Sequence, residues 1–271
     1  MDNRRAIGII DSGVGGLTVA KEVIRQLPLE QIVYFGDNAR CPYGPRSPEE
    51  IQTFTNQMIQ FVSQFHLKAL VIACNTATAV ALGKVKAQAT LPIIGVIEPG
   101  ARTAIMTSRS SRIGIIGTET TIRTGAYERA LYRINPDLYV VGLACPEFVP
   151  LVENQLLHTP EAKKIVADTL KPLCYEELDT LILGCTHYPL LAPLISEVMG
   201  DSISIISSAE ETARELSTIL SMRNLHNSSF TSVNHRFFTS GDADIFREIG
   251  EEWLGFEIEV TSQTLEEIFQ V

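Results

Sequence analysis

Residues 69–76 read ALVIACNT, and residues 180–187 read TLILGCTH. Each stretch is a short apolar run followed by a small residue, a cysteine and polar residues. Runs of this kind predict buried strands of a parallel sheet. Open α/β sheets bind their ligands at the carboxyl ends of the strands, which is where Cys74 and Cys185 would lie. The two stretches therefore predict one site with two thiols.

The composition is that of an ordinary globular protein. Its 271 residues suffice for two α/β domains, and 45% are hydrophobic and 20% charged. The formal net charge is −10 and no cluster of lysine or arginine stands out, so nucleic acid and membranes are not expected partners. No apolar run approaches the roughly 18 residues of a membrane span.

The N-terminal stretch and the cysteines predict the compartment. The first apolar run, at residues 7–10, is too short for a signal peptide. The five cysteines form no C-x-x-C pair and their number is odd, which argues against a disulfide framework. We therefore expect a cytoplasmic protein.

Four landmarks of the sequence occur twice, at an offset of roughly 105–110 residues. Residues 6–12 (AIGIIDS) match residues 112–118 (RIGIIGT). A second strand followed by a Cys-Pro pair, the cysteine strand and one further strand then recur in the same order. This repeat predicts an α/β fold of two pseudo-twofold-related βα domains, each with a mainly parallel sheet, with the active site in the cleft between them.

The repeat also indicates domain boundaries. The first domain is predicted to contain residues 1–97 plus 210–271, and the second residues 98–209. The tail has no counterpart in the repeat, and we expect it to return to the first domain with a last strand at residues 257–260. Residues 17–26 predict a helix, and the sequence Ser47-Pro48-Glu49-Glu50 is typical of the start of another.

Two thiols facing each other across a cleft suit proton transfer at a carbon acid. One thiolate removes a proton and the opposite thiol supplies another, which inverts the carbon, and a helix N-terminus can lower the pKa of the base. Cys74, Cys185 and His187 could instead bind zinc, but structural zinc ligands usually come in close pairs. A single nucleophilic cysteine activated by His187 would leave the second cysteine unexplained. We therefore favour acid/base chemistry and expect no metal.

Other candidate residues have a structural and a functional interpretation. Asp11, Ser12 and the glycines up to Gly16 form either a strand-to-helix turn with a capping side chain or a carboxylate-binding turn. Thr118 and Thr121 are either a helix cap or ligand contacts. Cys41 and Cys145, each followed by proline, are interpreted as structural, and Cys174 as a buried thiol on a helix. A charge on a helix face is the default for Glu153.

Several motifs together resemble one family. They are residues 9–18 (IIDSGVGGLT), 35–37 (FGD) with 42–44 (PYG), 73–77 (ACNTA) and 183–190 (LGCTHYPL). This set resembles the glutamate racemases of the aspartate/glutamate racemase superfamily, over about the whole chain. The resemblance implies a cofactor-independent enzyme that interconverts L- and D-glutamate and supplies D-glutamate for peptidoglycan.

The resemblance also implies roles for single residues. The catalytic groups would be Cys74 and Cys185 as the two acid/bases, with Asp11, His187 and Glu153 as auxiliary groups. The substrate-binding residues would be Asp11, Ser12, Tyr43, Gly44, Asn75, Thr76, Thr118, Thr121, Thr186 and His187. A homodimer is implied as well, and the short N-terminal stretch lacks the extension that accompanies regulation by a cell-wall precursor in some members.

Three alternatives stay open at this point. An aspartate racemase shares the two-cysteine plan, although His187-Tyr188-Pro189 is similar to the glutamate enzymes. A two-lobed amino-acid-binding protein without activity would have no need of two reactive thiols. A pyridoxal-phosphate racemase is disfavoured because no lysine follows a predicted strand.

Overall fold

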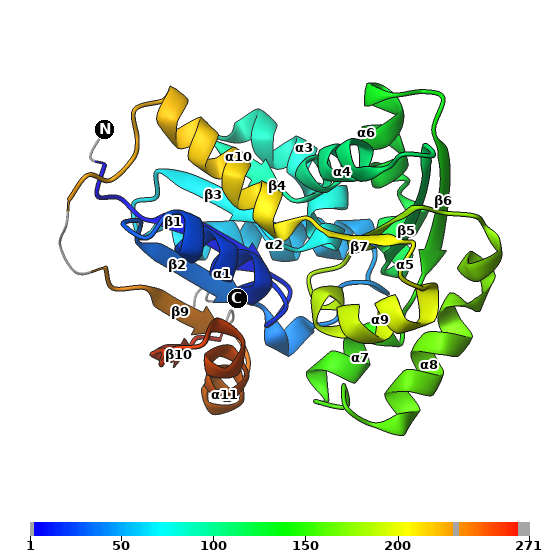
Figure 1. Cartoon of the computed structure of the whole chain (residues 1–271). Helices are drawn as coiled ribbons and strands as arrows, with labels where there is room; N and C mark the ends of the chain where they lie inside the picture. Colours follow the sequence, from blue (N-terminus) through cyan, green and yellow to red (C-terminus); the bar gives the residue numbers. More distant parts are fainter. Residues whose placement is uncertain (1–2, 230–232, 265–271) are drawn as a thin grey trace. The chain divides into compact units, whose positions relative to one another are not determined.

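The computed structural model describes residues 3–229 and 233–264. These residues form two compact units (Figure 1), one with residues up to Val96 together with those from Ala209 onward, and one with Ile97–Ser208. The division of the chain into independently folding domains, with a cleft and a pseudo-twofold axis between them, stays a prediction.

The first unit contains a six-stranded parallel sheet in the order β10-β9-β2-β1-β3-β4. Its strands are β1 (Ile7–Asp11), β2 (Ile32–Gly36), β3 (Ala69–Ile72), β4 (Ile93–Gly95), β9 (Arg236–Thr239) and β10 (Val260–Ser262). Its helices are α1 (Leu17–Gln26), α2 (Pro48–Ser63), α3 (Asn75–Gln88), α10 (Ala209–Met222), α11 (Ala243–Leu254) and the short 3-10 helix η1 (Asn38–Arg40).

Helices cover both faces of this sheet because its strands are apolar on both sides. Ile9 points to the face that α1, α10 and α11 cover, whereas the next residue, Ile10, packs with α2 and α3 on the other face. This alternation has the two-residue period of a strand. The start of α2 follows the predicted signals, since Ser47 and Glu50 form a reciprocal capping box.

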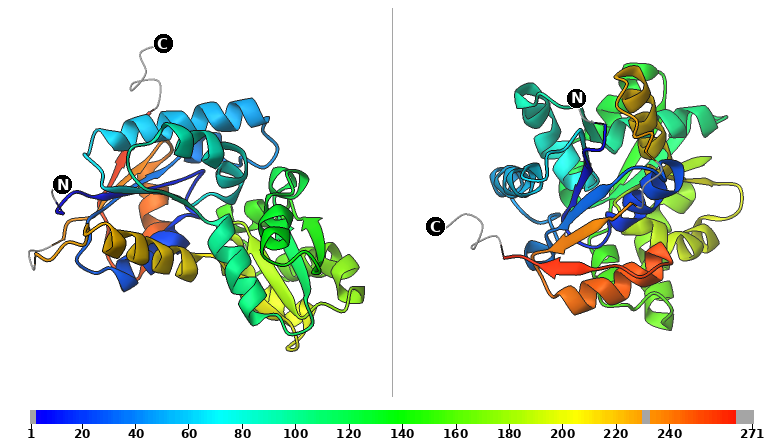
Figure 2. Two further views of the ribbon diagram at one scale, coloured as in Figure 1. Left: turned by 90° about the horizontal axis from the view of Figure 1, so that it is seen from above. Right: turned by 90° about the vertical axis from the view of Figure 1, so that its left-hand side faces the viewer.

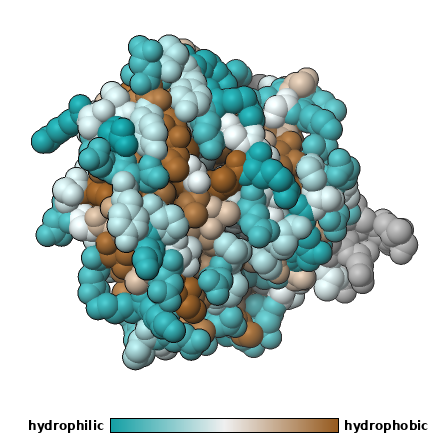
Figure 3. All heavy atoms as spheres, turned by 90° about the vertical axis from the view of Figure 1, so that its right-hand side faces the viewer, coloured by the Kyte–Doolittle hydropathy of each residue, from teal (hydrophilic) through white to brown (hydrophobic). Residues whose placement is uncertain are grey.

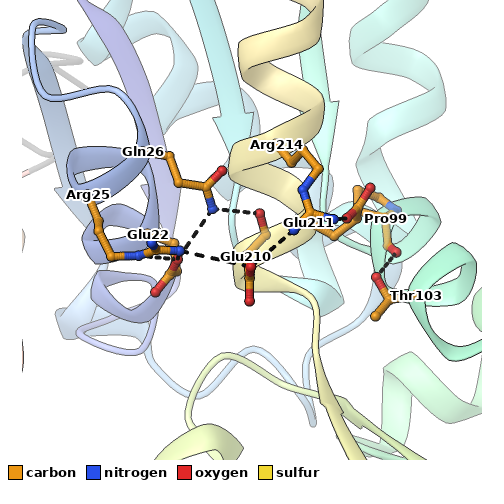
Figure 4. A network of polar contacts seen from close by, with 8 residues as sticks. All are labelled: Glu22, Arg25, Gln26, Pro99, Thr103, Glu210, Glu211 and Arg214. Atoms are coloured by element: carbon orange, nitrogen blue, oxygen red, sulfur yellow. Dashed lines mark hydrogen bonds and ion pairs between the residues drawn. The ribbon is translucent and has the colours of Figure 1, made fainter. Parts of the chain in front are cut away.

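The tail returns to the first unit. Strand β9 pairs with β2, and the two further views in Figure 2 show the tail strands beside the N-terminal ones. Helix α10 lies against α1, where Arg25 of α1 pairs with Glu22 and approaches Glu210 of α10 at 4.0 Å (Figure 4). Exposed ion pairs of this kind add little stability. Buried side chains such as Leu216 therefore hold the tail in place.

The second unit contains a four-stranded parallel sheet in the order β6-β5-β7-β8. Its strands are β5 (Arg112–Gly117), β6 (Tyr139–Ala144), β7 (Thr180–Gly184) and β8 (Ser204–Ser207). Its helices are α4 (Ile97–Thr107), α5 (Glu119–Arg123), α6 (Ala126–Ile134), α7 (Phe148–Glu153), α8 (Pro160–Leu170), α9 (Ala192–Met199) and the 3-10 helices η2 (Lys171–Tyr175) and η3 (Tyr188–Leu191).

The two sheets have the same strand order. The order β6-β5-β7-β8 repeats the order β2-β1-β3-β4 of the first unit. The predicted α/β fold with two mainly parallel sheets is thereby confirmed, and the second sheet lacks only the two strands of the tail. A last strand forms as predicted, but its bounds are Val260–Ser262 and not residues 257–260.

The surface of the chain is mixed. Strand β6 is an edge strand whose residues are only partly buried. On the face drawn in Figure 3, apolar residues reach the surface among polar ones. Among the described residues, no helix is both long enough and apolar enough to span a membrane.

Candidate active site

In each unit, a cysteine follows the central part of the sheet at the carboxyl ends of the strands. In the first unit Ile10 of β1 is paired with Ile72 of β3, and Cys74 comes two residues later. In the second unit the corresponding pair is Ile116 of β5 with Leu183 of β7, and Cys185 also comes two residues later. Counting from these pairs, Cys74 and Cys185 occupy equivalent positions of the repeat. This is the edge at which open α/β sheets bind ligands.

The sulfur of Cys74 lies at the start of a helix. Cys74 is the N-cap of α3 and its Sγ accepts a hydrogen bond from the amide of Ala77 at 3.4 Å. Its thiol also donates to Ser12 Oγ, 3.5 Å away. A helix N-terminus favours negative charge, so this position suits a thiolate. Asn75 and Thr76, in the first turn of the same helix, are both buried.

The side chain of Asp11 stabilises the turn that follows β1. The Asp11 carboxylate is fully buried and accepts a hydrogen bond from the amide of Gly13 at 3.0 Å. Helix α1 begins after Gly16 and has no side-chain cap, so the interpretation of Asp11 or Ser12 as a helix cap is wrong. A Cβ atom at Gly16 would lie 2.5 Å from the Asp11 Cβ, which explains the glycine.

Asp37 is a functional candidate that the sequence analysis missed. Its buried carboxylate accepts hydrogen bonds from Arg40 Nε at 2.7 Å, from Ser240 Oγ at 2.7 Å and from the hydroxyl of Tyr43. Burial, followed by the charge of Asp37, raises the pKa of Tyr43 well above its usual value. The phenol of Tyr43 is therefore neutral and held within the unit, and Asp37 fixes the loop that contains Tyr43 and Gly44. The position of Asp37 directly after β2 could have indicated it.

In the second unit, Cys185 contacts His187, which in turn contacts Glu153. Its Sγ lies 3.7 Å from His187 Nδ1, and His187 Nε2 lies 2.5 Å from Glu153 Oε1. Burial alone would lower the pKa of His187, but its hydrogen bonds to Cys185 and Glu153 raise it well above its usual value. The structure thus joins three residues that the resemblance placed together, and Glu153 is more than a charge on a helix face.

The threonines of the second unit have a clear structural role. Thr118 is the N-cap of α5 and accepts a hydrogen bond from the amide of Thr121 at 3.3 Å. The hydroxyls of the two residues are also bonded to each other, at 3.0 Å. The capping interpretation is therefore right for Thr118, and ligand contact by either residue stays a prediction. Thr186 is buried between Cys185 and His187.

Cys145 and Cys174 each differ from one expectation. The amide of Cys145 donates to the carbonyl of Gly117 at 2.8 Å, just as that of Asp37 donates to Asp11 at 3.0 Å. Cys145 is therefore the counterpart of Asp37, and its predicted match with Cys41 is wrong. Burial raises the pKa of the Cys145 thiol to about 12. Cys174 is exposed in η2, so its prediction as a buried thiol is wrong as well.

Comparison with known proteins assigns the chain to a family. The model of the family described as Asp/Glu/Hydantoin racemase matches residues 7–216, which include both strand-end cysteines. The chain belongs to this racemase family. It is accordingly an enzyme, and its class is isomerase.

Individual relatives of this racemase match nearly its whole length. The glutamate racemase of Oceanobacillus iheyensis is 55% identical over 248 residues, which are 91% of this chain and 90% of the relative. The crystal structure of glutamate racemase isoform RacE1 from Bacillus anthracis has a TM-score of 0.94 and 51% identity, and the match covers 97% of this chain and 98% of that one. Glutamate racemase from Francisella tularensis, solved in complex with D-glutamate, has a TM-score of 0.90 and 31% identity, with 98% and 99% covered.

Proposed function

We propose that this racemase interconverts L- and D-glutamate by proton transfer at Cα between two thiols. The observation that carries the proposal is the equivalent position of Cys74 and Cys185 at the strand ends of two sheets with the same strand order. The names of the relatives support glutamate as the substrate. Glutamate would bind with one thiol on each face of Cα.

In this mechanism the two cysteines exchange roles between directions. The thiolate of one cysteine takes the α-proton, so the Cα–H bond breaks and an S–H bond forms. The thiol of the other cysteine then gives its proton to the opposite face of Cα and becomes a thiolate. No electron acceptor is needed, because each turnover only moves protons. A bound carbanion requires charge stabilisation from preorganised donors.

The other candidate residues have supporting roles in the proposal. Asp11 would assist Cys74, whereas His187 and Glu153 would assist Cys185. Glutamate would contact Asp11, Ser12, Tyr43, Gly44, Asn75, Thr76, Thr118, Thr121, Thr186 and His187. For Tyr43 and Gly44 the backbone is the expected donor, because the Tyr43 hydroxyl is engaged with Asp37.

A proton-exchange assay tests function and mechanism together. In D₂O, the purified protein without added cofactor should place deuterium at Cα of both L- and D-glutamate while it interconverts them. Cys74→Ala and Cys185→Ala should each abolish racemisation, whereas Cys174→Ala, at an exposed position, should leave it unchanged. Normal racemisation by either active-site variant would refute the two-thiol assignment.

Parallel assays separate the alternatives. Faster turnover of aspartate than of glutamate would favour an aspartate racemase. Loss of activity with a chelator or with a carbonyl reagent would point to a metal or to pyridoxal phosphate, neither of which the proposal requires.

The protein would act in the cytoplasm as a homodimer and supply D-glutamate for peptidoglycan. Depletion of the protein in a host should stop growth unless D-glutamate is added to the medium. Sedimentation equilibrium should give twice the 29.8 kDa mass of the chain.

A further inference from the structure

One backbone carbonyl accepts hydrogen bonds from two segments, α7 and the turn that follows Cys185. The carbonyl of Cys145 accepts a hydrogen bond from the Tyr188 hydroxyl at 2.8 Å and another from the amide of Phe148 at 3.2 Å. Phe148 begins α7, which ends at Glu153, and Tyr188 begins η3 directly after His187. The helix with the carboxylate and the turn with the imidazole are thus tied to the same oxygen atom.

The aromatic rings of these two residues add to the connection. The rings of Phe148 and Tyr188 meet edge to face, with centroids 5.2 Å apart and an angle of 68° between the planes. Both side chains are fully buried. The amide of Tyr188 also donates to the carbonyl of Cys185 at 3.2 Å. Tyr188 therefore contacts the thiol-bearing turn through its backbone and α7 through its side chain.

We propose that Tyr188 is a positioning residue for Cys185 and sets how readily this thiol exchanges a proton with the substrate. The inference rests on the two-thiol mechanism proposed above. Tyr188 would not touch the reacting atoms, because its hydroxyl is bonded to Cys145. It holds η3 so that His187 meets Glu153 at 2.5 Å and Cys185 at 3.7 Å. The contact between His187 and Glu153 joins the turn to α7, so it depends directly on where Tyr188 holds the turn.

Substrate isotope effects separate this role from a loss of stability. Cys185 removes the α-proton in one direction and returns a proton in the other. If proton transfer at Cys185 becomes slower, that step limits the rate in both directions. The isotope effect of an α-deuterated substrate then rises for the enantiomer that Cys185 deprotonates. It falls toward unity for the other enantiomer, because the C–H bond of that enantiomer is broken by Cys74.

The test compares Tyr188→Phe with the wild-type chain on protiated and α-deuterated L- and D-glutamate. Loss of a hydrogen bond worth about 1 kcal/mol should lower kcat/KM by about fivefold. The two isotope effects should move in opposite directions. Isotope effects that both stay at wild-type values, or that move together, would overturn the proposal.

Tyr127→Phe is the matched control. Tyr127 lies in the same unit, is buried, and has its hydroxyl bonded to Ser208 instead of Cys145. This variant should be less stable than the wild type, but its isotope effects for L- and D-glutamate should not move in opposite directions. An equal opposite movement in Tyr127→Phe would show that any buried hydroxyl has the effect, and would overturn the specific role of Tyr188.

Phe148→Leu keeps the test available if Tyr188→Phe does not fold. It leaves the phenol in place and removes the edge-to-face contact, so a smaller movement in the same sense is expected. If the wild-type protein does not racemise glutamate, the proposed function itself is refuted. Wild-type racemisation with unchanged isotope effects in Tyr188→Phe and Phe148→Leu would sink only the role of Tyr188.

Discussion

Asp37 and Cys145 occupy the same position in the two sheets. Each lies just after the second strand of its unit, and each donates its amide to the residue that ends the neighbouring strand, at 3.0 Å and 2.8 Å respectively. Both then anchor the chain that follows, Asp37 through its carboxylate, which accepts from Arg40, and Cys145 through its backbone carbonyl, which accepts from the amide of Phe148. The two units therefore anchor the chain at the same position of the repeat, one with a side-chain carboxylate and the other with a backbone carbonyl.

Asp37→Asn should destabilise the first unit and weaken substrate binding. The substitution removes the charge that pairs with Arg40. It also puts an amide nitrogen in place of one carboxylate oxygen, either Oδ2, which accepts from Tyr43, or Oδ1, which accepts from Ser240. Breaking a buried pair of this kind costs about 3 kcal/mol of unfolding free energy. Because Tyr43 would be released, KM should rise more than kcat falls. Denaturant unfolding and steady-state kinetics measure the two effects.

The control for this variant is Asp137→Asn, at an exposed position. It should change the unfolding free energy by less than about 0.5 kcal/mol. Equal stability of the two variants would show that the Asp37 network does not support the fold.

Glu153→Gln should lower the pKa of His187. In the folded protein this pKa is raised, because the bonds to Cys185 and Glu153 outweigh burial. A raised folded pKa means that charged His187 stabilises the protein below the ordinary histidine pKa of about 6.5. That contribution is lost as the pH rises through the folded pKa. In Glu153→Gln the loss should begin at lower pH.

Two measurements check the effect of Glu153. An NMR titration follows His187 directly, and unfolding free energies at several pH values show where its contribution disappears. An identical His187 titration in wild type and Glu153→Gln would contradict the coupling. His158→Gln, a change at a histidine outside the Cys185 group, should leave the His187 titration unchanged.

Gly16→Ala and Gly83→Ala should have opposite effects on stability. A Cβ at Gly16 would lie 2.5 Å from the Asp11 Cβ and 2.6 Å from the Tyr34 hydroxyl, so the turn must shift. We expect a loss of about 1–3 kcal/mol and a lower kcat. Gly83 lies within α3 with open space around its Cα, and alanine there should stabilise the helix by up to about 1 kcal/mol.

Thermal unfolding and racemase assays of both variants test this contrast. A Gly16→Ala protein with wild-type stability and activity would show that the turn around Asp11 tolerates displacement.

Cys174 should react with a thiol reagent long before Cys145. Cys174 is exposed, whereas Cys145 is buried and has a pKa of about 12. At pH 8 only about one Cys145 in 10⁴ would be a thiolate, the form that reacts. Iodoacetamide labelling followed by peptide mass spectrometry should find Cys174 modified first. Labelling in denaturant should modify both, and early modification of native Cys145 would contradict its burial.

Parts of the fold follow from local patterns. Helix α1 has the predicted bounds, and the capping box of Ser47 and Glu50 forms as expected. These features depend on neighbours three or four residues apart, which the sequence displays directly. The last strand was misplaced because β10 is three residues long at a sheet edge, where pairing rather than apolar pattern sets its bounds.

The sequence by itself determined the α/β class, the repeat and the two strand-end cysteines, because strand period and motif order are properties of neighbouring residues. Tertiary structure decided which side chains meet. Cys74 meets Ser12 across 62 positions of the chain, and Glu153 meets His187 across 34. Such contacts depend on strand register and on where α7 and η3 pack. For the same reason the Cys-Pro motif matched Cys145 with Cys41 in the repeat. Backbone hydrogen bonding shows instead that Cys145 is equivalent to Asp37.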